Sequence, residues 1–171
     1  MSQFLNFGSG SNGVLTVSSP TTHAPIDSSC SGSIGSTSLS ATNVSFATGQ
    51  FIMVHQSRGT GAGQWEINKI ASYVAGTITL VHPLSYTYAD SGASQSQVIV
   101  MPQYSDIAVS STLTAKAWNG NVGGIIPLLC SIKLPAVKQF TVPYLRTDLL
   151  TVIGRRLQPS SILKRICGFR T

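Results

Sequence analysis

Few side chains in this sequence could do chemistry, and those few are far apart. Three histidines are spread along the chain: His23, His55 and His82. None has a carboxylate or cysteine beside it at the spacing of metal ligands, so a metal site would need the fold to assemble it. Three cysteines are also widely separated: Cys30, Cys130 and Cys167. They form neither a CxxC pair nor a complete disulfide framework, so we expect buried small hydrophobes at these positions, no metal and no cofactor.

A glycine-rich loop, Gly59-Thr-Gly-Ala-Gly63, has the composition of a phosphate cradle. Such cradles lie between a strand and the amino terminus of a helix. This loop instead leads into Trp65 and a strand-like pattern, so we interpret it as a turn. The serines add no catalytic signal, because the sequence contains no GxSxG nucleophile elbow.

Aromatic side chains are the best candidates for ligand contact. Flat rings with a polar edge suit the apolar faces of sugars, and five such rings stand out: Trp65, Tyr86, Tyr88, Tyr104 and Trp118. Core packing is the better interpretation of Trp65, which lies in an alternating strand pattern. Trp118, beside Asn119 and Gly120 in an expected loop, is the first choice as a carbohydrate contact, with Tyr104 and Tyr88 as further candidates.

The first 131 residues are typical of an all-β protein. The whole chain is 42% hydrophobic but only 9% charged, which indicates a packed core and a surface made soluble by hydroxyls and amides. Period-two alternation predicts strands in residues 51–56, 65–74, 77–81 and 97–101, with a hairpin turn at Ala75-Gly76. We expect a small barrel or sandwich from these strands. Residues rich in Ser, Thr, Pro and Gly between positions 18 and 45 predict surface loops, with thin strand candidates around Ile34 and Leu39.

The composition divides the chain into four segments. Residues 1–47 form a Gly/Ser/Thr-rich leading segment with short strands, and residues 48–104 form the compact β module. Residues 105–131 alternate short strands with glycine loops, which predicts one or two rungs of a β-solenoid. Residues 132–171 form a short basic tail that can become helical after Thr147-Asp148.

The tail holds eight of the eleven Lys and Arg residues and one acid, so the net charge of +6 belongs to it. Four of its cations are candidate anion-binding residues: Arg155, Arg156, Lys164 and Arg165. Their amphipathic setting suits phosphates or an anionic membrane, and we expect nucleic acid or membrane binding only through this tail. Two other interpretations stay open, a solvated tail and a truncated or out-of-frame terminus.

Four stretches of sequence together resemble a known class of protein. They are residues 7–18, Gly61-Ala-Gly-Gln-Trp-Glu-Ile-Asn-Lys-Ile70, Pro102-Gln-Tyr104 and Trp118-Asn-Gly-Asn-Val-Gly-Gly124. The set resembles the amino-terminal region of glycine-rich bacterial surface proteins and phage tail or spike proteins, in which a small β module leads into a pectin-lyase-like right-handed β-helix. The resemblance covers residues 4–130 and ends where the basic tail begins. It implies a structural or adhesive role on a cell surface or a virion.

The resemblance raises the question of catalysis, because some such proteins cleave polysaccharides. A polysaccharide lyase would need clustered acids for calcium and a nearby base. The acids of residues 1–131 are instead dispersed: Asp27, Glu66, Asp90 and Asp106. We therefore expect a non-enzymatic module, with a glycan-binding or glycan-cleaving fragment as the alternative and anion binding by the tail as a second one.

The expected partners and location follow from the same reasoning. We expect self-association or a structural protein partner, and a surface glycan as a further partner. The first residues, Met1-Ser-Gln-Phe-Leu-Asn, have neither a basic region nor an apolar run, so no cleavable signal peptide is predicted. The expected location is an extracellular surface or a virion.

Overall fold

The computed structural model describes residues 8–43 and 45–131, and every regular element in that part of the chain is a β-strand. The predicted all-β class is confirmed there, and no helix in the described part is long and apolar enough to cross a membrane. The tail, with its expected helix, lies outside the described residues. The chain divides into two units, a barrel unit (Ala24–Met101 and Ala117–Gly124) and a paired-strand unit, described at residues 8–23, 102–116 and 125–131.

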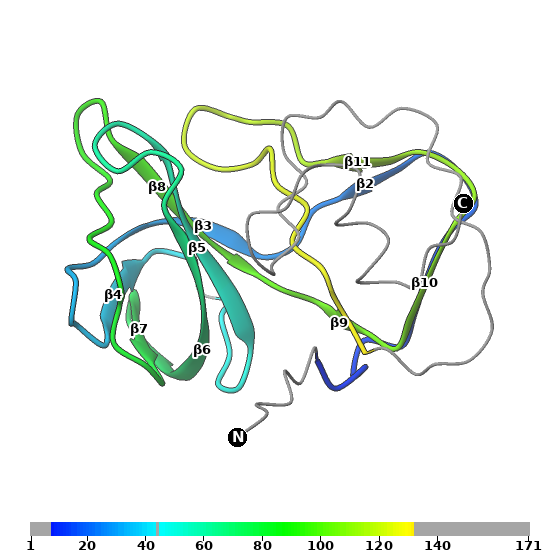
Figure 1. Cartoon of the computed structure of the whole chain (residues 1–171), viewed down its shortest axis with the longest axis horizontal. Helices are drawn as coiled ribbons and strands as arrows, with labels where there is room; N and C mark the ends of the chain where they lie inside the picture. Colours follow the sequence, from blue (N-terminus) through cyan, green and yellow to red (C-terminus); the bar gives the residue numbers. More distant parts are fainter. Residues whose placement is uncertain (1–7, 44, 132–171) are drawn as a thin grey trace, which may run out of the picture. The chain divides into compact units, whose positions relative to one another are not determined.

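The barrel unit is a closed antiparallel barrel of six strands in the order β3-β4-β7-β6-β5-β8 (Figure 1). Its strands are β3 (Asp27–Ser31), β4 (Ser38–Ala41), β5 (Phe51–Arg58), β6 (Trp65–Val74), β7 (Thr77–Leu80) and β8 (Gln95–Val100). The sequence left open a barrel or a sandwich, and the closing pair of β3 with β8 makes it a barrel.

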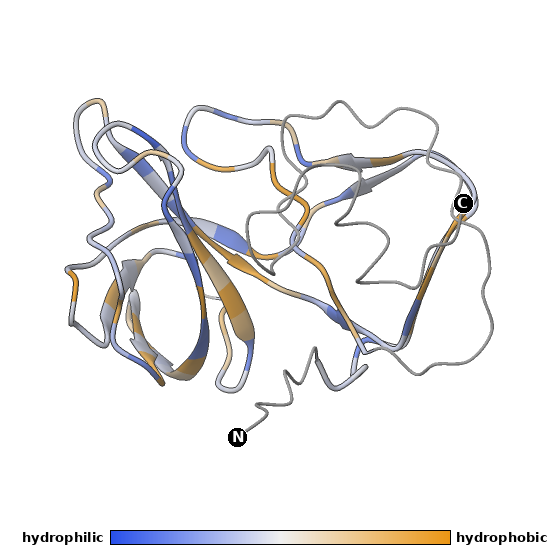
Figure 2. Ribbon diagram, in the orientation of Figure 1, coloured by the Kyte–Doolittle hydropathy of each residue, from blue (hydrophilic) through white to orange (hydrophobic). Residues whose placement is uncertain are grey.

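Alternation along the strands decides which side chains fill the barrel, and Figure 2 shows hydrophobic and hydrophilic residues interleaved on its ribbons. On β5, Ile52 and Val54 belong to the hydrophobic core, while Met53 points to the other face. The strand predicted over residues 51–56 from this alternation is confirmed. The core is otherwise built from aliphatic, aromatic and small residues of all six strands and their connections: Cys30, Leu39, Ala41, Phe46, Ile70, Ile78, Leu80, Leu84, Tyr88 and Val98.

The β6–β7 hairpin follows the prediction from Ala75-Gly76. Both turn residues have positive φ, 46° at Ala75 and 87° at Gly76, which is the twist that a two-residue hairpin turn requires. Val74 pairs with Thr77 across the turn, and a bulge shifts the register between Ile70 and Ser72.

The region between residues 18 and 45 was predicted as surface loops with strand candidates around Ile34 and Leu39. The candidate at Leu39 is confirmed as β4, whereas the loop prediction is wrong at β3, and these two strands complete the barrel by pairing with β7 and β8. On β4, Leu39 and Ala41 are buried while Ser38 and Ser40 are exposed. On β3 the buried residues are Ser28 and Cys30, whose small side chains give a weak hydrophobic signal. The strand candidate at Ile34 is a turn instead, and its side chain is 65% exposed.

Buried carboxamides fasten the barrel's connecting segments. The Gln97 side chain accepts a hydrogen bond from the Gly123 N–H at 2.9 Å and donates to the Gly123 carbonyl at 3.2 Å and to Ser57 Oγ at 2.8 Å. Asn68 binds the His82 backbone in the same two-sided way. A neutral amide satisfies both a donor and an acceptor of the backbone, which explains how a barrel poor in charge holds its loops.

The paired-strand unit consists of three parallel two-stranded sheets. Its strands are β1 (Val14–Val17), β2 (Thr21–His23), β9 (Gln103–Tyr104), β10 (Asp106–Val109), β11 (Leu113–Ala115) and β12 (Leu129–Cys130). β1 pairs with β10, β2 with β11 and β9 with β12. Two of these pairs join a segment before the barrel to a segment after it. The sequence did not predict that pairing.

Replacement of Gln97 by Leu tests the role of the buried amides. We expect Gln97→Leu to lower the free energy of unfolding by about 1–3 kcal/mol, because the Gly123 N–H and carbonyl lose their partner inside the protein. The matched control is Gln95→Leu in the same strand, since the buried Gln95 Oε1 has no hydrogen-bond partner in the described part of the chain. Urea unfolding of both variants gives the answer, and equal losses would contradict this role.

Candidate ligand-binding site

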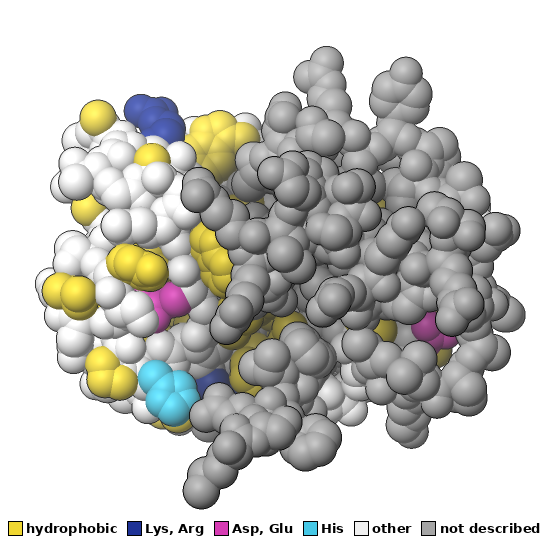
Figure 3. All heavy atoms as spheres, in the orientation of Figure 1, with side chains coloured by type: hydrophobic (Ala, Val, Ile, Leu, Met, Phe, Trp, Pro, Cys, Tyr) yellow, Lys and Arg dark blue, Asp and Glu magenta, His cyan; other side chains and the backbone are white. Residues whose placement is uncertain are grey.

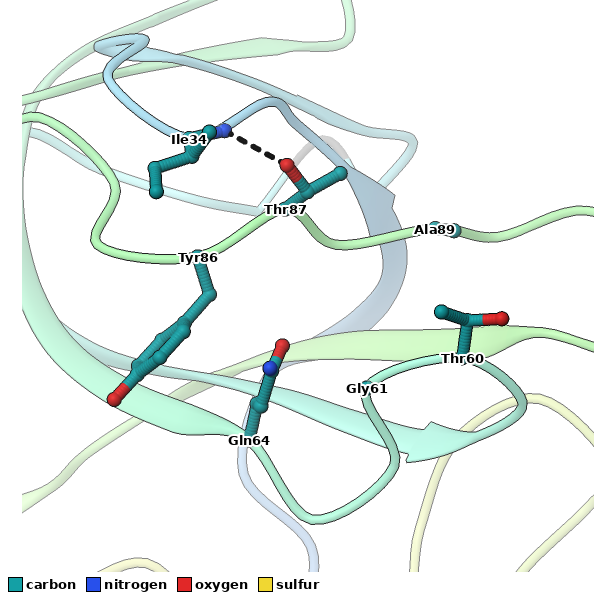
Figure 4. A pocket seen from close by; sticks show the side chains of 7 residues that line it. All are labelled: Ile34, Thr60, Gly61, Gln64, Tyr86, Thr87 and Ala89. Atoms are coloured by element: carbon teal, nitrogen blue, oxygen red, sulfur yellow. Dashed lines mark hydrogen bonds between the residues drawn. The ribbon is translucent and has the colours of Figure 1, made fainter.

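Two pockets adjoin the irregular segment between β7 and β8 of the barrel unit. The first has a volume of about 310 Å³ and is lined by seven residues: Ile34, Thr60, Gly61, Gln64, Tyr86, Thr87 and Ala89 (Figure 4). The second has a volume of about 340 Å³ and is lined by eight: Ser31, Gly32, Ser33, Thr87, Tyr88, Ala89, Asp90 and Ser91. Thr87 and Ala89 line both pockets. We refer to the first as the Tyr86 pocket.

One buried side chain, Gln56 of β5, fastens two walls of the Tyr86 pocket. Its amide nitrogen donates to the Ala89 carbonyl and its amide oxygen accepts from the Ala89 N–H, both at 2.9 Å. Its backbone N–H donates to the Gln64 carbonyl, and its own carbonyl accepts from the Gly63 N–H. Since Gln56 is 0% exposed, both loops are anchored to the interior of the barrel.

The third wall, around Ile34, is held by hydrogen bonds to the same irregular segment. The Ile34 N–H donates to Thr87 Oγ1 at 3.1 Å (Figure 4), and Gly32 and Tyr88 exchange two backbone hydrogen bonds at 3.0 and 2.8 Å. Three segments that are distant in the sequence therefore meet at this pocket through local hydrogen bonds.

Gly61 is required where the loop from Gly59 to Gly63 borders the pocket. Its φ is +80°, and a Cβ at this position would lie 2.6 Å from Gln64 Oε1. A larger residue would be strained and would displace the Gln64 side chain. Gly59 likewise approaches Ser94 closely, with a built Cβ only 2.6 Å from the Ser94 Cα. The loop is thus a tight turn leading to β6, and the interpretation of this sequence as a turn is confirmed.

Tyr86 presents the largest flat surface in the pocket. Its side chain is 40% exposed, and its ring meets the Tyr88 ring edge to face, with centroids 6.5 Å apart and planes at 87°. Figure 4 shows the Tyr86 ring beside the Gln64 amide, with Ile34 above it. None of the seven lining residues carries a charge, in keeping with the mostly uncharged described surface in Figure 3.

Tyr88, predicted as a sugar contact, is not available for that role, because only 1% of its side chain is exposed. Its ring fills the barrel core, and its buried hydroxyl has no hydrogen-bond partner of normal geometry among the described residues. Burial, together with the nearby Glu66 carboxylate, raises the pKa of the Tyr88 phenol. Its neighbour Tyr86, noted among the aromatics but not selected, carries the exposed ring instead.

The other two predicted sugar contacts, Trp118 and Tyr104, lie in different units from each other. Trp118 is 39% exposed and belongs to the 117–124 segment of the barrel unit, which Gln97 fastens through Gly123. Tyr104 lies in β9 of the paired-strand unit, and burial raises its phenol pKa. Sugar binding by these two residues stays a prediction. The predicted anion-binding residues Arg155, Arg156, Lys164 and Arg165 lie outside the described part of the chain.

Titratable groups in the described residues do not assemble into a metal site, since no three of His, Cys, Asp and Glu gather there. Burial lowers the pKa of His23, against a smaller opposing effect of the Pro127 backbone, and burial also lowers the pKa of His55.

Burial raises the pKa of Cys30 to about 12, which leaves it an unreactive thiol. Glu66 accepts hydrogen bonds from the Ser85 N–H at 3.1 Å.

Comparisons with known proteins assign no family to this chain. No family model matches it, and no curated protein matches it. Among solved structures, it is similar to the gp54 tailspike of the Acinetobacter baumannii bacteriophage AP22, determined in complex with A. baumannii capsular saccharide. The TM-score is 0.38 and the identity 11%, and the match covers 60% of this chain and 21% of the tailspike chain. The likeness is loose, and this chain spans only a small part of that protein's length.

Substitutions at Tyr88 test its assignment to the core. We expect Tyr88→Phe to leave the free energy of unfolding within about 1 kcal/mol of the original, because the buried hydroxyl makes no hydrogen bond of normal geometry with the described residues. Tyr88→Ala should lower it by about 3–5 kcal/mol through loss of the ring from the core. Urea unfolding measures both. A large loss in Tyr88→Phe would show that the hydroxyl makes a strong interaction and would contradict this description.

Proposed function

We propose that this chain is a non-catalytic structural module of a cell-surface fibre or a phage tail appendage, in which stacked parallel strands carry a barrel. The observation that supports it best is the parallel pairing across the barrel. β1 pairs with β10 from Val14–Asp106 to Val17–Val109, and β2 pairs with β11 from Thr21–Leu113 to His23–Ala115. Strands on either side of the barrel in the sequence thus run side by side in register.

The spacing of these strands repeats, which supports the start of a β-solenoid. β1 and β2 begin seven residues apart, at Val14 and Thr21, and β10 and β11 begin seven residues apart, at Asp106 and Leu113. In Figure 1, β9, β10 and β11 follow one another along the three sides of a triangle. Coils of a β-solenoid stack in this way, each pairing with the next and burying its inner side chains against it.

A fibre or tail appendage is the setting that such a module suits. Each strand of the β1–β10 and β2–β11 pairs has one hydrogen-bonded neighbouring strand among the described residues. A further coil or a partner strand can therefore add to the stack. The partner would be a second copy of this chain or another structural protein of the same assembly. The chain has few charged residues, so hydroxyl and amide groups make its surface soluble. Such a surface suits an assembly that is exposed to solvent.

The described acids support a role without catalysis. Asp27, Glu66 and Asp90 belong to the barrel unit, while Asp106 belongs to β10 of the paired-strand unit, where its side chain accepts from the Ile107 N–H. In the part of the chain that the structure describes, no three of His, Cys, Asp and Glu gather as the ligands of a metal ion would, which supports a role without calcium-assisted elimination.

A depolymerisation assay tests this proposal. The protein is incubated with homogalacturonan, alginate and hyaluronan, and reducing ends and unsaturated products are followed over time. We expect no release above the buffer blank, because the proposed role is structural and the described residues hold no gathered group of metal-ligating side chains. A commercial polysaccharide lyase serves as the positive control. Product that grows with protein concentration and disappears in Asp90→Asn would overturn the non-catalytic role and favour a glycan-cleaving protein.

A further inference from the structure

We propose that the Tyr86 pocket binds an uncharged sugar residue, a neutral hexose or N-acetylhexosamine at the end of a glycan. This gives the barrel a binding function of its own. It goes beyond the structural role and does not depend on whether the paired strands continue as a solenoid.

The stacking surface is the first observation. Tyr86 exposes its ring, and the edge-to-face contact with the buried Tyr88 ring holds that ring in place. The apolar face of a pyranose suits such a ring, which combines an apolar body with a polar hydroxyl. Ile34, which is largely exposed in the same pocket, extends the apolar surface.

Unused hydrogen-bonding capacity is the second observation. The Gln64 amide and the Thr60 hydroxyl line the pocket and make no side-chain hydrogen bond with the described residues. Thr87 Oγ1 accepts from the Ile34 N–H, so its own hydroxyl hydrogen stays available to donate. The pocket thus offers an amide donor, an amide acceptor and two hydroxyls, which match the hydroxyl groups around a sugar ring.

Charge selects the kind of sugar. None of the lining residues of the Tyr86 pocket is charged, and the adjoining pocket is lined by one charged side chain, Asp90. An uncharged site beside a carboxylate disfavours a uronic acid or another anionic sugar, because the anion would lose hydration and meet a like charge. A neutral sugar meets neither penalty. A volume of about 310 Å³ lies at the small end of ligand sites and suits a terminal residue better than a long oligosaccharide.

Preorganisation is the third observation. Gln56 ties the loop around Gln64 and the segment around Ala89 to one buried position, and the Ile34–Thr87 hydrogen bond ties the third wall. Gly61 leaves room for the Gln64 side chain. Since the walls are already ordered, a ligand spends little of its binding free energy on arranging them.

The test is an NMR titration of the full-length, ¹⁵N-labelled protein with methyl glycosides of glucose, galactose and N-acetylglucosamine, and with methyl glucuronide as the anionic match. We expect saturable shifts for at least one neutral glycoside, centred on residues 34, 60–64 and 86–89, with a dissociation constant on the order of millimolar. Glucuronide should bind at least about 5-fold more weakly than glucose, because of its charge.

Variants assign the binding to the pocket. Tyr86→Ala should weaken it by at least about 10-fold, whereas Tyr86→Phe, which keeps the ring, should stay within about 3-fold. Gln64→Leu should also weaken it, through loss of the amide. Val74→Ala is the matched control, since Val74 is an exposed hydrophobic residue of the same barrel, 70% exposed, outside the pocket lining. Thr87→Ala, which removes the hydroxyl that accepts from the Ile34 N–H and can donate to the sugar, should also weaken binding and provides a second variant if Tyr86→Ala fails to fold.

Three outcomes would overturn the proposal. The first is no saturable shift for any of the neutral glycosides at about 50 mM, far above a millimolar dissociation constant. The second is binding centred on Trp118 and abolished by Trp118→Ala, which would place the site elsewhere. The third is glucuronide binding as tight as that of glucose. None of these results would affect the structural proposal, which the depolymerisation assay tests separately.

Discussion

The pairing of β3 with β8 is the constraint on which the rest of this structure depends. These are the first and last strands of the barrel, and Asp27 opposes Ile99 while the Val100 N–H donates to the Ile26 carbonyl. Closing the barrel therefore brings together the two ends of the chain segment that forms it, which is a long insertion between β2 and β9. A folded insertion whose ends are held together adds little to the entropy of closing the surrounding chain, whereas a flexible loop would cost about 0.6 kcal/mol more for each doubling of its length. The segments that flank the barrel are thus kept within reach, and β1 and β2 can pair with β10 and β11.

Neutral polar groups, rather than charges, give the barrel its specificity. Gln56 and Gln97 are buried, and each satisfies both a donor and an acceptor of a distant backbone segment. A buried charge at these positions would need a partner of opposite sign, and burial would cost more than an amide costs. The Tyr86 pocket likewise has no charged lining residue, and amide and hydroxyl groups surround its exposed ring. The same kinds of neutral polar group therefore fasten the barrel's loops and line the proposed sugar site.

The sequence predicted the parts of the fold that large side chains define. Alternating aliphatics marked β5, β6, β7 and β8, and Ala75-Gly76 marked the hairpin, because these signals are local. Leu39 marked β4 only as a thin candidate, because serines flank it, and β3 was missed because its inward residues, Ser28 and Cys30, are small.

The candidate site could not be read from the sequence in the same way. Exposed aromatics were recognised as candidates, but sequence alone did not tell buried Tyr88 from exposed Tyr86. The two residues lie in an irregular segment without a period that would assign faces. The walls also come from three distant segments, and the residue that joins two of them, Gln56, looks like any surface glutamine until the fold buries it. Parallel pairing across the barrel is equally non-local, so no sequence period announced it.

The most direct test of the central claim is an engineered disulfide between β1 and β10. Thr16 and Ala108 are register partners with exposed side chains. Neighbouring strands lie about 4.8 Å apart, within the range of roughly 4.4–6.8 Å that a disulfide spans between Cα atoms. We predict that the double variant Thr16→Cys/Ala108→Cys cross-links under mild oxidation, shown by peptide mass mapping, and that neither single variant does. The out-of-register pair Thr16→Cys/Asp106→Cys should not, since two residues of offset place the Cα atoms about 8 Å apart. Failure of the first pair to cross-link, or equal cross-linking of the second, would contradict the parallel stack that carries the barrel.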